Sequence, residues 1–260
     1  MHSYTGKERI LYDHVFMYVM AWEAEMRYGG RVSAPEEDFT AVQVSPGKEI
    51  LMIIYLFRHG ETDWNKERRL QGQSDIPLNE FGRELAEKTA EALREVPFDM
   101  AFCSPMSRAR ETAEIILGDR RVPLIEDDRL KEINFGVCEG QRFDSAKEDG
   151  SHPLHNFFCR PERYVPPAGA ESFAQAEERT GDFMKTRILP LEKQCGTVLV
   201  VAHGALNRSI LNSIEGIPVE DFWHIDLGNC AAAILSLENG KFAVLEESRV
   251  YYGNPVNGRP

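Results

Sequence analysis

Two continuous apolar runs stand out along the chain, and each one ends abruptly in a histidine followed by a glycine. The first run, "LMIIYLF", ends before Arg58 and His59, and the second, "TVLVVA", ends before His203. A run of this length without polar alternation is typical of a strand that is covered on both faces. The pattern therefore predicts two buried strands that each present an imidazole at the carboxyl end.

Amphipathic segments alternate with short apolar segments around these two runs. Four segments have helical periodicity: residues 80–96, 104–117, 171–194 and 205–216. Ser104 and Pro105 are expected to be the N-cap and first residue of the second helix, and Pro190 should kink or end the third. "FDMAFCS" and "VPLIED" predict further strands, and Asn239-Gly240 favours a type I′ hairpin turn. The alternation predicts an α/β fold of three layers, α/β/α, with a mainly parallel central sheet.

The two ends of the chain differ from its middle in composition. Residues 1–49 predict an amphipathic helix (residues 4–28) and a polar connector, and residues 254–260 form a polar tail. We expect this extension to pack on the domain or on a partner, unless Met52 is the native start. Residues 50–253 are expected to form the functional domain.

Charge and cysteine content limit the function classes. The 260 residues carry a net charge of −12, which argues against a general nucleic-acid or acidic-membrane binder but allows one local positive pocket. The five cysteines include no CxxC pair, so we expect reduced thiols in a cytoplasmic protein. The apolar stretch at residues 10–22 is too short to span a bilayer and lacks a signal-peptide cleavage site, so secretion is the weaker alternative.

The two histidines are the first candidates for chemistry. Ligands of open α/β sheets bind outside the carboxyl ends of the strands, so His59 and His203 should lie at the same edge. Arg58 precedes one of them, and Arg108 lies in the first turn of a helix, where free N–H groups favour an anion. Together these residues predict a cationic pocket suited to a phosphoryl group. The alternative is that Arg108 pairs with a surface carboxylate such as Glu111.

An acidic group in the segment "RLKEINFGVCEG" is the candidate general acid and base. Glu132 precedes a glycine-punctuated loop, and a carboxyl group beside a phosphate pocket can protonate a leaving group and then activate water. Its neighbours Asp127, Asp128 and Glu139 are equally acidic, so spacing alone does not select Glu132.

Five motifs occur in a fixed order within residues 52–249: "RHGETDWN", "QGQSDIPLNEFG", "SPMSRARETA", "RLKEINFGVCEG" and "VAHG". In combination they resemble the histidine phosphatase superfamily, in the branch of the cofactor-dependent phosphoglycerate mutases and related phosphatases. The resemblance implies a phosphoglycerate mutase-like fold. It implies that His59 becomes phosphorylated and that Glu132 protonates the leaving oxygen and then activates water. Further catalytic and phosphate-binding positions follow from it: Arg58, Thr62, Asn65, Gln71, Arg108, His203 and Gly204.

The segment at residues 139–170 bears on the choice between phosphatase and mutase. It is rich in proline, glycine and charge, which predicts an irregular lid. The mutases that the chain resembles carry a longer insertion with an Arg-Arg pair, whereas this lid has isolated arginines at Arg142, Arg160 and Arg163. "GAES" resembles the Gly-Gly-Glu-Ser of the phosphatases, with Ala170 in place of one glycine. We therefore expect a phosphatase.

The expected reaction is hydrolysis of small phosphomonoesters by a phosphoric monoester hydrolase that needs no metal and no cofactor. The alternatives are a cofactor-dependent phosphoglycerate mutase and a non-catalytic module that binds a phosphorylated partner. Arg160, Arg163 and Tyr164 are either readers of the substrate's non-phosphate end or solvated loop residues. A metal site at His152, His155 and Cys159 is disfavoured because a fourth ligand is missing.

The expected partner is a small phosphorylated metabolite, with no nucleic acid and no membrane. The apolar face of the N-terminal helix gives a weak indication of a homo-oligomer. The identity of the phosphomonoester does not follow from the sequence.

Overall fold

The structure, a computed structural model, describes residues 51–252. The predicted helix at residues 4–28, the connector, the proposed role of this extension in self-association and the tail at 254–260 lie outside the described residues. In the described part of the chain, no helix is both long enough and apolar enough to cross a membrane.

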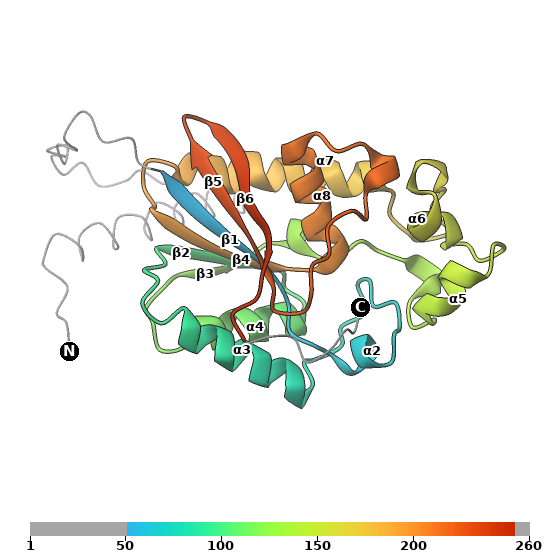
Figure 1. The fold of residues 1–260 in the computed structure, drawn as a ribbon, viewed down its shortest axis with the longest axis horizontal. Coiled ribbons are helices and arrows are strands. Elements are labelled where there is room, and N and C mark those ends of the chain that lie inside the picture. Colours follow the sequence, from blue (N-terminus) through green and yellow to red (C-terminus); the bar gives the residue numbers. More distant parts are fainter. Residues whose placement is uncertain (1–50, 253–260) are drawn as a thin grey trace, which may run out of the picture. The chain divides into compact units, whose positions relative to one another are not determined.

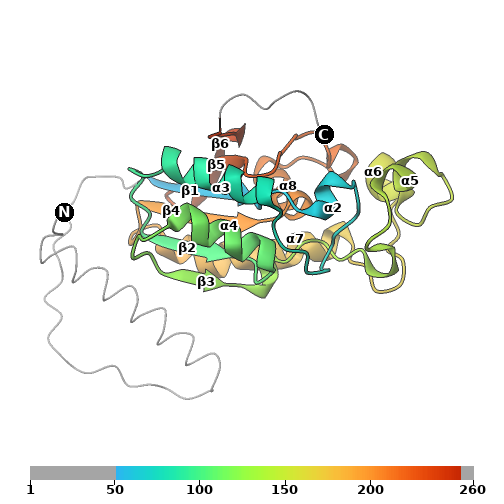
Figure 2. The ribbon, with the colours of Figure 1, turned by 90° about the horizontal axis from the view of Figure 1, so that it is seen from below.

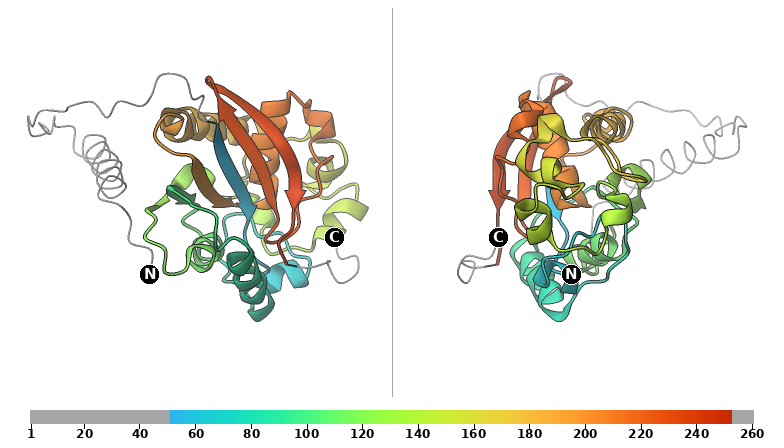
Figure 3. Two further views of the ribbon diagram at one scale, coloured as in Figure 1. Left: turned by 60° about the vertical axis from the view of Figure 1, so that its left-hand side comes forward. Right: turned by 90° about the vertical axis from the view of Figure 1, so that its right-hand side faces the viewer.

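Six strands form one sheet in the order β3-β2-β4-β1-β5-β6. Their bounds are β1 Met52–Arg58, β2 Met100–Cys103, β3 Leu124–Glu126, β4 Thr197–Ala202, β5 Ala232–Glu238 and β6 Lys241–Arg249. The strands β3, β2, β4 and β1 are parallel, and β5 and β6 complete the sheet as an antiparallel hairpin beside β1. Figure 3 shows this hairpin in red next to the blue β1. The prediction of a mainly parallel sheet is confirmed.

Helices cover both faces of the sheet, as predicted. Their bounds are α2 Asp63–Lys66, α3 Glu80–Ala92, α4 Ser107–Leu117, α5 Phe143–Glu148, α6 His155–Cys159, α7 Phe173–Phe183 and α8 Gly204–Glu215. The helices α3 and α4 lie on one face, and α7 and α8 lie on the other (Figures 1 and 2). Short 3-10 helices connect these elements: η1 Asp128–Leu130, η2 Gly136–Cys138, η3 Pro161–Arg163, η5 Leu189–Leu191 and η6 Val219–Asp221.

Burial on both faces explains why the strands are continuously apolar. Phe57 and Val201 belong to the core cluster that includes Ala113 of α4. On the opposite face, Phe102 of β2 packs edge-on against Phe183 of α7, with ring centroids 5.5 Å apart. Because both faces of such a strand are buried, its residues do not alternate in polarity. Polar side chains come directly after the strand instead.

Local signals set two of the element ends. After α7 the chain continues as a π-helix, Met184–Ile188 (η4), and the 3-10 helix at Pro190 ends this helical stretch, as expected. Asn239 and Gly240 both have positive φ, at 52° and 75°, as a type I′ turn requires.

The predicted start of α4 is wrong. The helix begins at Ser107, and Met106 occupies the N-cap position without a side-chain cap. Ser104 lies further upstream, where its hydroxyl accepts a hydrogen bond from the N–H of Met106 at 3.3 Å and contacts His203. The serine is therefore part of the site at the end of β2.

The lid segment, residues 139–170, is more regular than predicted, because it contains α5, α6 and the 3-10 helix η3. These helices lie beyond the ends of α7 and α8, on the right in Figures 1 and 2. Phe157 of α6 is fully buried and stacks on Phe173 of α7 at 4.7 Å. Trp223 packs against the same ring and donates its indole N–H to the carbonyl of Phe157 at 2.7 Å. Aromatic burial orders a segment whose proline and glycine content indicated irregular structure.

Candidate active site

Three adjacent strands bring the candidate residues together. His59, His203 and Ser104 directly follow β1, β4 and β2, which are neighbours in the sheet. The N–H of His59 donates to the carbonyl of Ala202 at 3.0 Å, and the N–H of Ser104 donates to that of Val201 at 3.0 Å. The parallel ladder thus continues into the site and fixes the backbone of both residues.

The two imidazoles lie side by side and are both buried. Their ring centroids are 5.2 Å apart, and the planes meet at 62°. Nδ1 of His59 donates to the carbonyl of Gly60 at 2.6 Å. A carbonyl oxygen only accepts, so Nδ1 carries the proton, and in the neutral ring Nε2 holds the lone pair. The tautomer of His59 is therefore the one that a nucleophile at Nε2 requires.

His203 has a different hydrogen-bond pattern. Its Nε2 lies 2.8 Å from the hydroxyl of Ser104, which can donate or accept. Its Nδ1 is buried and has no hydrogen-bond partner among the described residues. A buried polar atom without a partner is costly, and a ligand oxygen that accepts from Nδ1 would satisfy it.

Both histidines are held in the neutral form. Burial, followed by the charges of Arg108 and Arg58, lowers the pKa of His59 well below its ordinary value of 6.5. Burial, followed by Arg108, lowers the pKa of His203 in the same direction. The charges of the arginines favour the neutral imidazoles, and burial contributes more.

The two predicted arginines reach the pocket from different elements: Arg58 is the last residue of β1, and Arg108 lies in the first turn of α4. Nη1 of Arg58 donates to the carbonyl of Leu227 at 2.8 Å. Arg108 is fully buried and donates to the carbonyls of Gly72 at 2.7 Å and Ser74 at 2.8 Å. The Nε atom of each guanidinium is buried without a hydrogen-bond partner in residues 51–252. These unpaired donors suit an anion with several oxygens.

The alternative partner for Arg108 is excluded. Glu111 lies one turn further along α4 and pairs with Arg83 at 2.6 Å. Burial lowers the pKa of Arg108 to about 10, which still leaves the group charged at neutral pH. The guanidinium therefore faces the interior as a cation held by backbone carbonyls.

The carboxyl group of Glu132 is held by backbone N–H groups next to His203. Its Oε1 accepts from the N–H of Leu206 at 2.9 Å and from its own neighbour Ile133 at 2.9 Å. Its Oε2 accepts from the N–H of Ala205 at 3.2 Å. Two of these donors belong to the first turn of α8, directly after His203, so the carboxyl group lies at the N-terminus of that helix.

The competing acids have structural partners. Asp127 pairs with Arg129 at 2.6 Å, and Asp128 pairs with Lys131 at 2.8 Å. Glu139 accepts from the N–H of Gln73 at 2.8 Å and from the hydroxyl of Ser74, and so holds the loop whose carbonyls bind Arg108.

The remaining predicted residues lie around this pocket. Thr62 caps α2 in a reciprocal capping box with Asn65. The side-chain oxygen of Asn65 accepts from the N–H of Thr62 at 3.1 Å, so its amide nitrogen is the atom that can donate to a phosphate oxygen. Gln71 is buried, and its side-chain oxygen has no partner among the described residues. Gly204 is the first residue of α8, between the guanidinium groups of Arg58 and Arg208.

Sequence reasoning missed several residues of the site. The hydroxyl of Thr112 accepts from the N–H of Gly60 at 3.0 Å, and Nδ2 of Asn229 donates to the carbonyls of His59 and Gly60 at 3.0 and 3.1 Å. Arg208 is buried near Arg58. None of these residues lies beside a histidine in the sequence. The one available signal was helical spacing. Thr112 follows Arg108 by four residues, and Arg208 follows Gly204 by four residues.

Several lid residues considered for substrate or metal binding have other contacts or are exposed. Arg160 and Arg163 are exposed, and the side chain of Arg163 lies 3.4 Å from Glu162. The ring of Tyr164 packs edge-on against Phe157 at 5.0 Å. His152 uses both ring nitrogens, toward Gln141 at 2.7 Å and the N–H of Leu154 at 3.0 Å. A metal at His152 would have to break these contacts.

A sheet edge that presents a neutral imidazole beside buried cations and a carboxyl group is a framework for phosphoryl transfer through histidine. The profile of the histidine phosphatase superfamily (branch 1) matches residues 54–248. The chain belongs to this superfamily, and the predicted phosphoglycerate mutase-like fold is confirmed. Enzymes of both kinds, phosphatases and mutases, occur among its relatives.

Three similar proteins illustrate this range. A 2,3-bisphosphoglycerate-dependent phosphoglycerate mutase from Parvibaculum lavamentivorans is 30% identical over 201 residues, which cover 75% of this chain and 95% of the relative. The structure of Bacillus stearothermophilus YhfR matches with a TM-score of 0.69 at 32% identity and covers 75% of this chain and 96% of that one. A phosphoserine phosphatase mutant from Entamoeba histolytica, in complex with phosphoserine, matches with a TM-score of 0.65 at 26% identity, over 75% and 95% of the two chains.

Proposed function

We propose that this protein is a metal-independent phosphatase that hydrolyses small phosphomonoesters through a phosphohistidine on His59. The observation that carries the proposal is the tautomer of His59: Nδ1 is held by the carbonyl of Gly60, and burial and two arginines keep the ring neutral. An imidazole in this state is a ready nucleophile at Nε2.

In the first step, Nε2 of His59 attacks phosphorus and the bond from phosphorus to the ester oxygen breaks. The leaving oxygen takes a proton from the carboxyl group of Glu132. The transferred group carries negative charge on its oxygens, which the guanidinium groups of Arg58 and Arg108 stabilise.

In the second step, the carboxylate of Glu132 takes a proton from water, and the water oxygen attacks phosphorus. The N–P bond breaks and inorganic phosphate leaves. His203 contributes a donor if the hydroxyl of Ser104 donates to its Nε2, because the ring proton then resides on Nδ1. Asn65, Gln71, Thr62 and the N–H of Gly204 complete the proposed phosphate site.

The lid supports a phosphatase over a mutase. A mutase must hold a second acidic group of its substrate, and the lid arginines that we considered for this task, Arg160 and Arg163, are exposed. Arg142 pairs with Asp144 at 3.5 Å and is also exposed. The mutase remains the second candidate, because the curated relatives reported above include a phosphoglycerate mutase.

The test is a panel of phosphomonoesters, assayed with EDTA for wild type and for His59→Ala. The panel includes 3-phosphoglycerate with and without 2,3-bisphosphoglycerate. We expect the wild type to release phosphate and His59→Ala to release none. Isomerised phosphoglycerate without phosphate release would establish the mutase instead. No turnover of either kind would leave a module that binds a phosphorylated partner.

A further inference from the structure

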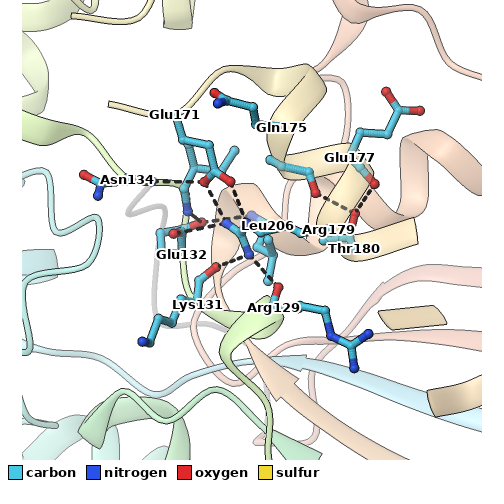
Figure 4. Close-up of polar contacts among 12 residues, drawn as sticks. Arg129, Lys131, Glu132, Asn134, Glu171, Gln175, Glu177, Arg179, Thr180 and Leu206 are labelled. Atoms are coloured by element: carbon cyan, nitrogen blue, oxygen red, sulfur yellow. Dashed lines mark hydrogen bonds and ion pairs between the residues drawn. The ribbon is translucent and has the colours of Figure 1, made fainter. Parts of the chain in front are cut away.

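Arg179, in the middle of α7, makes an unusual set of contacts beside Glu132 (Figure 4). One of its terminal nitrogens, Nη1, donates to the carbonyls of Arg129 at 2.5 Å and Lys131 at 2.7 Å. The other, Nη2, donates to the carbonyl of Glu132 itself at 3.3 Å. A single guanidinium therefore gathers three carbonyls of the segment that leads to Glu132.

Glu171 holds this guanidinium in place. Its two carboxylate oxygens accept from Nε and Nη2 of Arg179 at 2.6 and 2.8 Å, and both side chains are largely buried. Its backbone N–H also donates to the carbonyl of Asn134 at 2.8 Å. The ion pair is bidentate, the arrangement in which arginine gives the most geometric restraint.

These contacts and those of the carboxyl group restrain Glu132 from two sides. Arg179 fixes the main chain of Glu132 to α7, and the N–H groups of Ala205 and Leu206 fix its carboxyl group to α8. The helices α7 and α8 lie on the same face of the sheet (Figure 1). A carboxyl group that must reach both a leaving oxygen and a water molecule needs such restraint, because small displacements of a catalytic group reduce the rate strongly.

We propose that Arg179, oriented by Glu171, is a positioning residue that sets the place of the Glu132 carboxyl group for proton transfer. The inference rests on the proposed function, because Arg179 acts only through Glu132 in its role as acid and base. Lysine cannot replace the arginine fully, because one ammonium group cannot bind three carbonyls and both oxygens of a carboxylate at once.

The experiment is a double-mutant cycle with Arg179→Lys and Glu132→Gln, assayed on the panel ester with the highest turnover. We expect Arg179→Lys to lower kcat/KM by about 10- to 100-fold, the loss typical of a misplaced catalytic group. We expect the double variant to be no slower than Glu132→Gln alone, because a positioning residue has nothing left to position. Glu171→Gln is the second variant, with a smaller loss in the same direction.

Arg120→Lys is the matched control. Arg120 also donates to several backbone carbonyls, among them Leu117 at 2.9 Å and Leu93 at 2.9 Å, but these belong to the ends of α4 and α3. We expect it to lower the melting temperature as Arg179→Lys does while leaving kcat/KM within about twofold of wild type.

A second readout compares phenyl phosphate with 4-nitrophenyl phosphate. Nitrophenolate leaves without a proton, so a misplaced acid should slow the phenyl ester more than the nitrophenyl ester. Additive losses in the cycle, or equal losses on both esters, would overturn the inference and leave the proposed function intact. Failure of the wild type to release phosphate from any ester would overturn the proposed function, and the inference with it.

Discussion

The carboxyl ends of β1 and β4 share one sequence pattern, a buried strand followed by histidine and glycine, yet the two ends are built differently. At the end of β1, Nδ1 of His59 is tied to the adjacent carbonyl of Gly60. At the end of β4, Nε2 of His203 contacts Ser104 after a third strand, and Nδ1 has no partner among the described residues. The two rings are equally buried and differ in which nitrogen is engaged.

The glycines that follow the histidines also differ. Gly60 lies against the backbone of Gly82, where an added Cβ would be 2.7 Å from the carbonyl oxygen. Gly204 lies beside side chains, 3.3 Å from Nε of Arg58 for the same added atom. The Gly60 turn packs against the first turn of α3, and the Gly204 turn faces the cationic pocket.

The largest expected effect is on the rate of phosphate release, and it differs between the two histidines. We expect His59→Asn to lose phosphate release by at least about 10⁴-fold, because no nucleophile remains. We expect His203→Asn to lose only about 10²- to 10³-fold, the range for one oxyanion donor. Alkaline quenching during turnover should trap covalent phosphate on the His203 variant and none on the His59 variant. Trapped phosphate on His59→Asn would reverse the two roles.

The fold was predictable where burial dictates the residue pattern. The strands β1 and β4 are covered on both faces, and their apolar runs follow directly from that. The lid was not, because its order comes from contacts between Phe157 and aromatic rings far along the chain, such as Phe173 and Trp223. Such long-range packing leaves no periodic signal in a segment rich in proline and glycine.

The site was predictable to the extent that its residues follow strands. His59, His203 and Arg58 were found from that position alone, whereas the choice of Glu132 over its acidic neighbours depended on the resemblance. In the structure the carboxyl group of Glu132 accepts hydrogen bonds from N–H groups at the N-terminus of α8, next to His203, and its role as acid and base stays a prediction. Arg179 has no such marker, because its function depends on carbonyl groups about 50 residues earlier.

The second prediction tests the difference between the glycines. We expect Gly60→Ala to reduce the free energy of unfolding by about 1 to 3 kcal/mol, since the backbone of Gly82 cannot yield as a side chain can. We expect Gly204→Ala to leave stability within about 1 kcal/mol of wild type, because a guanidinium can shift and alanine favours the helix. Urea denaturation measures both.

Gly181→Ala provides the control, because this glycine of α7 is exposed and an added Cβ there meets nothing within 4 Å. It should raise stability by about 0.5 to 1 kcal/mol, the helix propensity difference. Equal losses for Gly60→Ala and Gly204→Ala would mean that the two turns are equivalent after all.

The last prediction concerns a property that the two histidines share. Both have a pKa lowered well below 6.5 by burial and by the arginines. Below pH 6.5 the unfolded chain therefore binds protons that the folded chain does not, so stability falls as the pH falls. Each histidine should contribute about 1.4 kcal/mol per pH unit to this loss, down to its own lowered pKa.

We therefore expect His59→Asn and His203→Asn each to flatten the fall in unfolding free energy between pH 6.5 and 5, and the double variant to flatten it about twice as much. Denaturant titrations at half-unit intervals would measure this, and above pH 7 all four curves should run parallel. Equal contributions would mean that burial lowers the pKa of both imidazoles alike. The two histidines would then differ only in their hydrogen bonds. If only one variant flattens the fall, the two histidines differ in their protonation as well as in their hydrogen bonds.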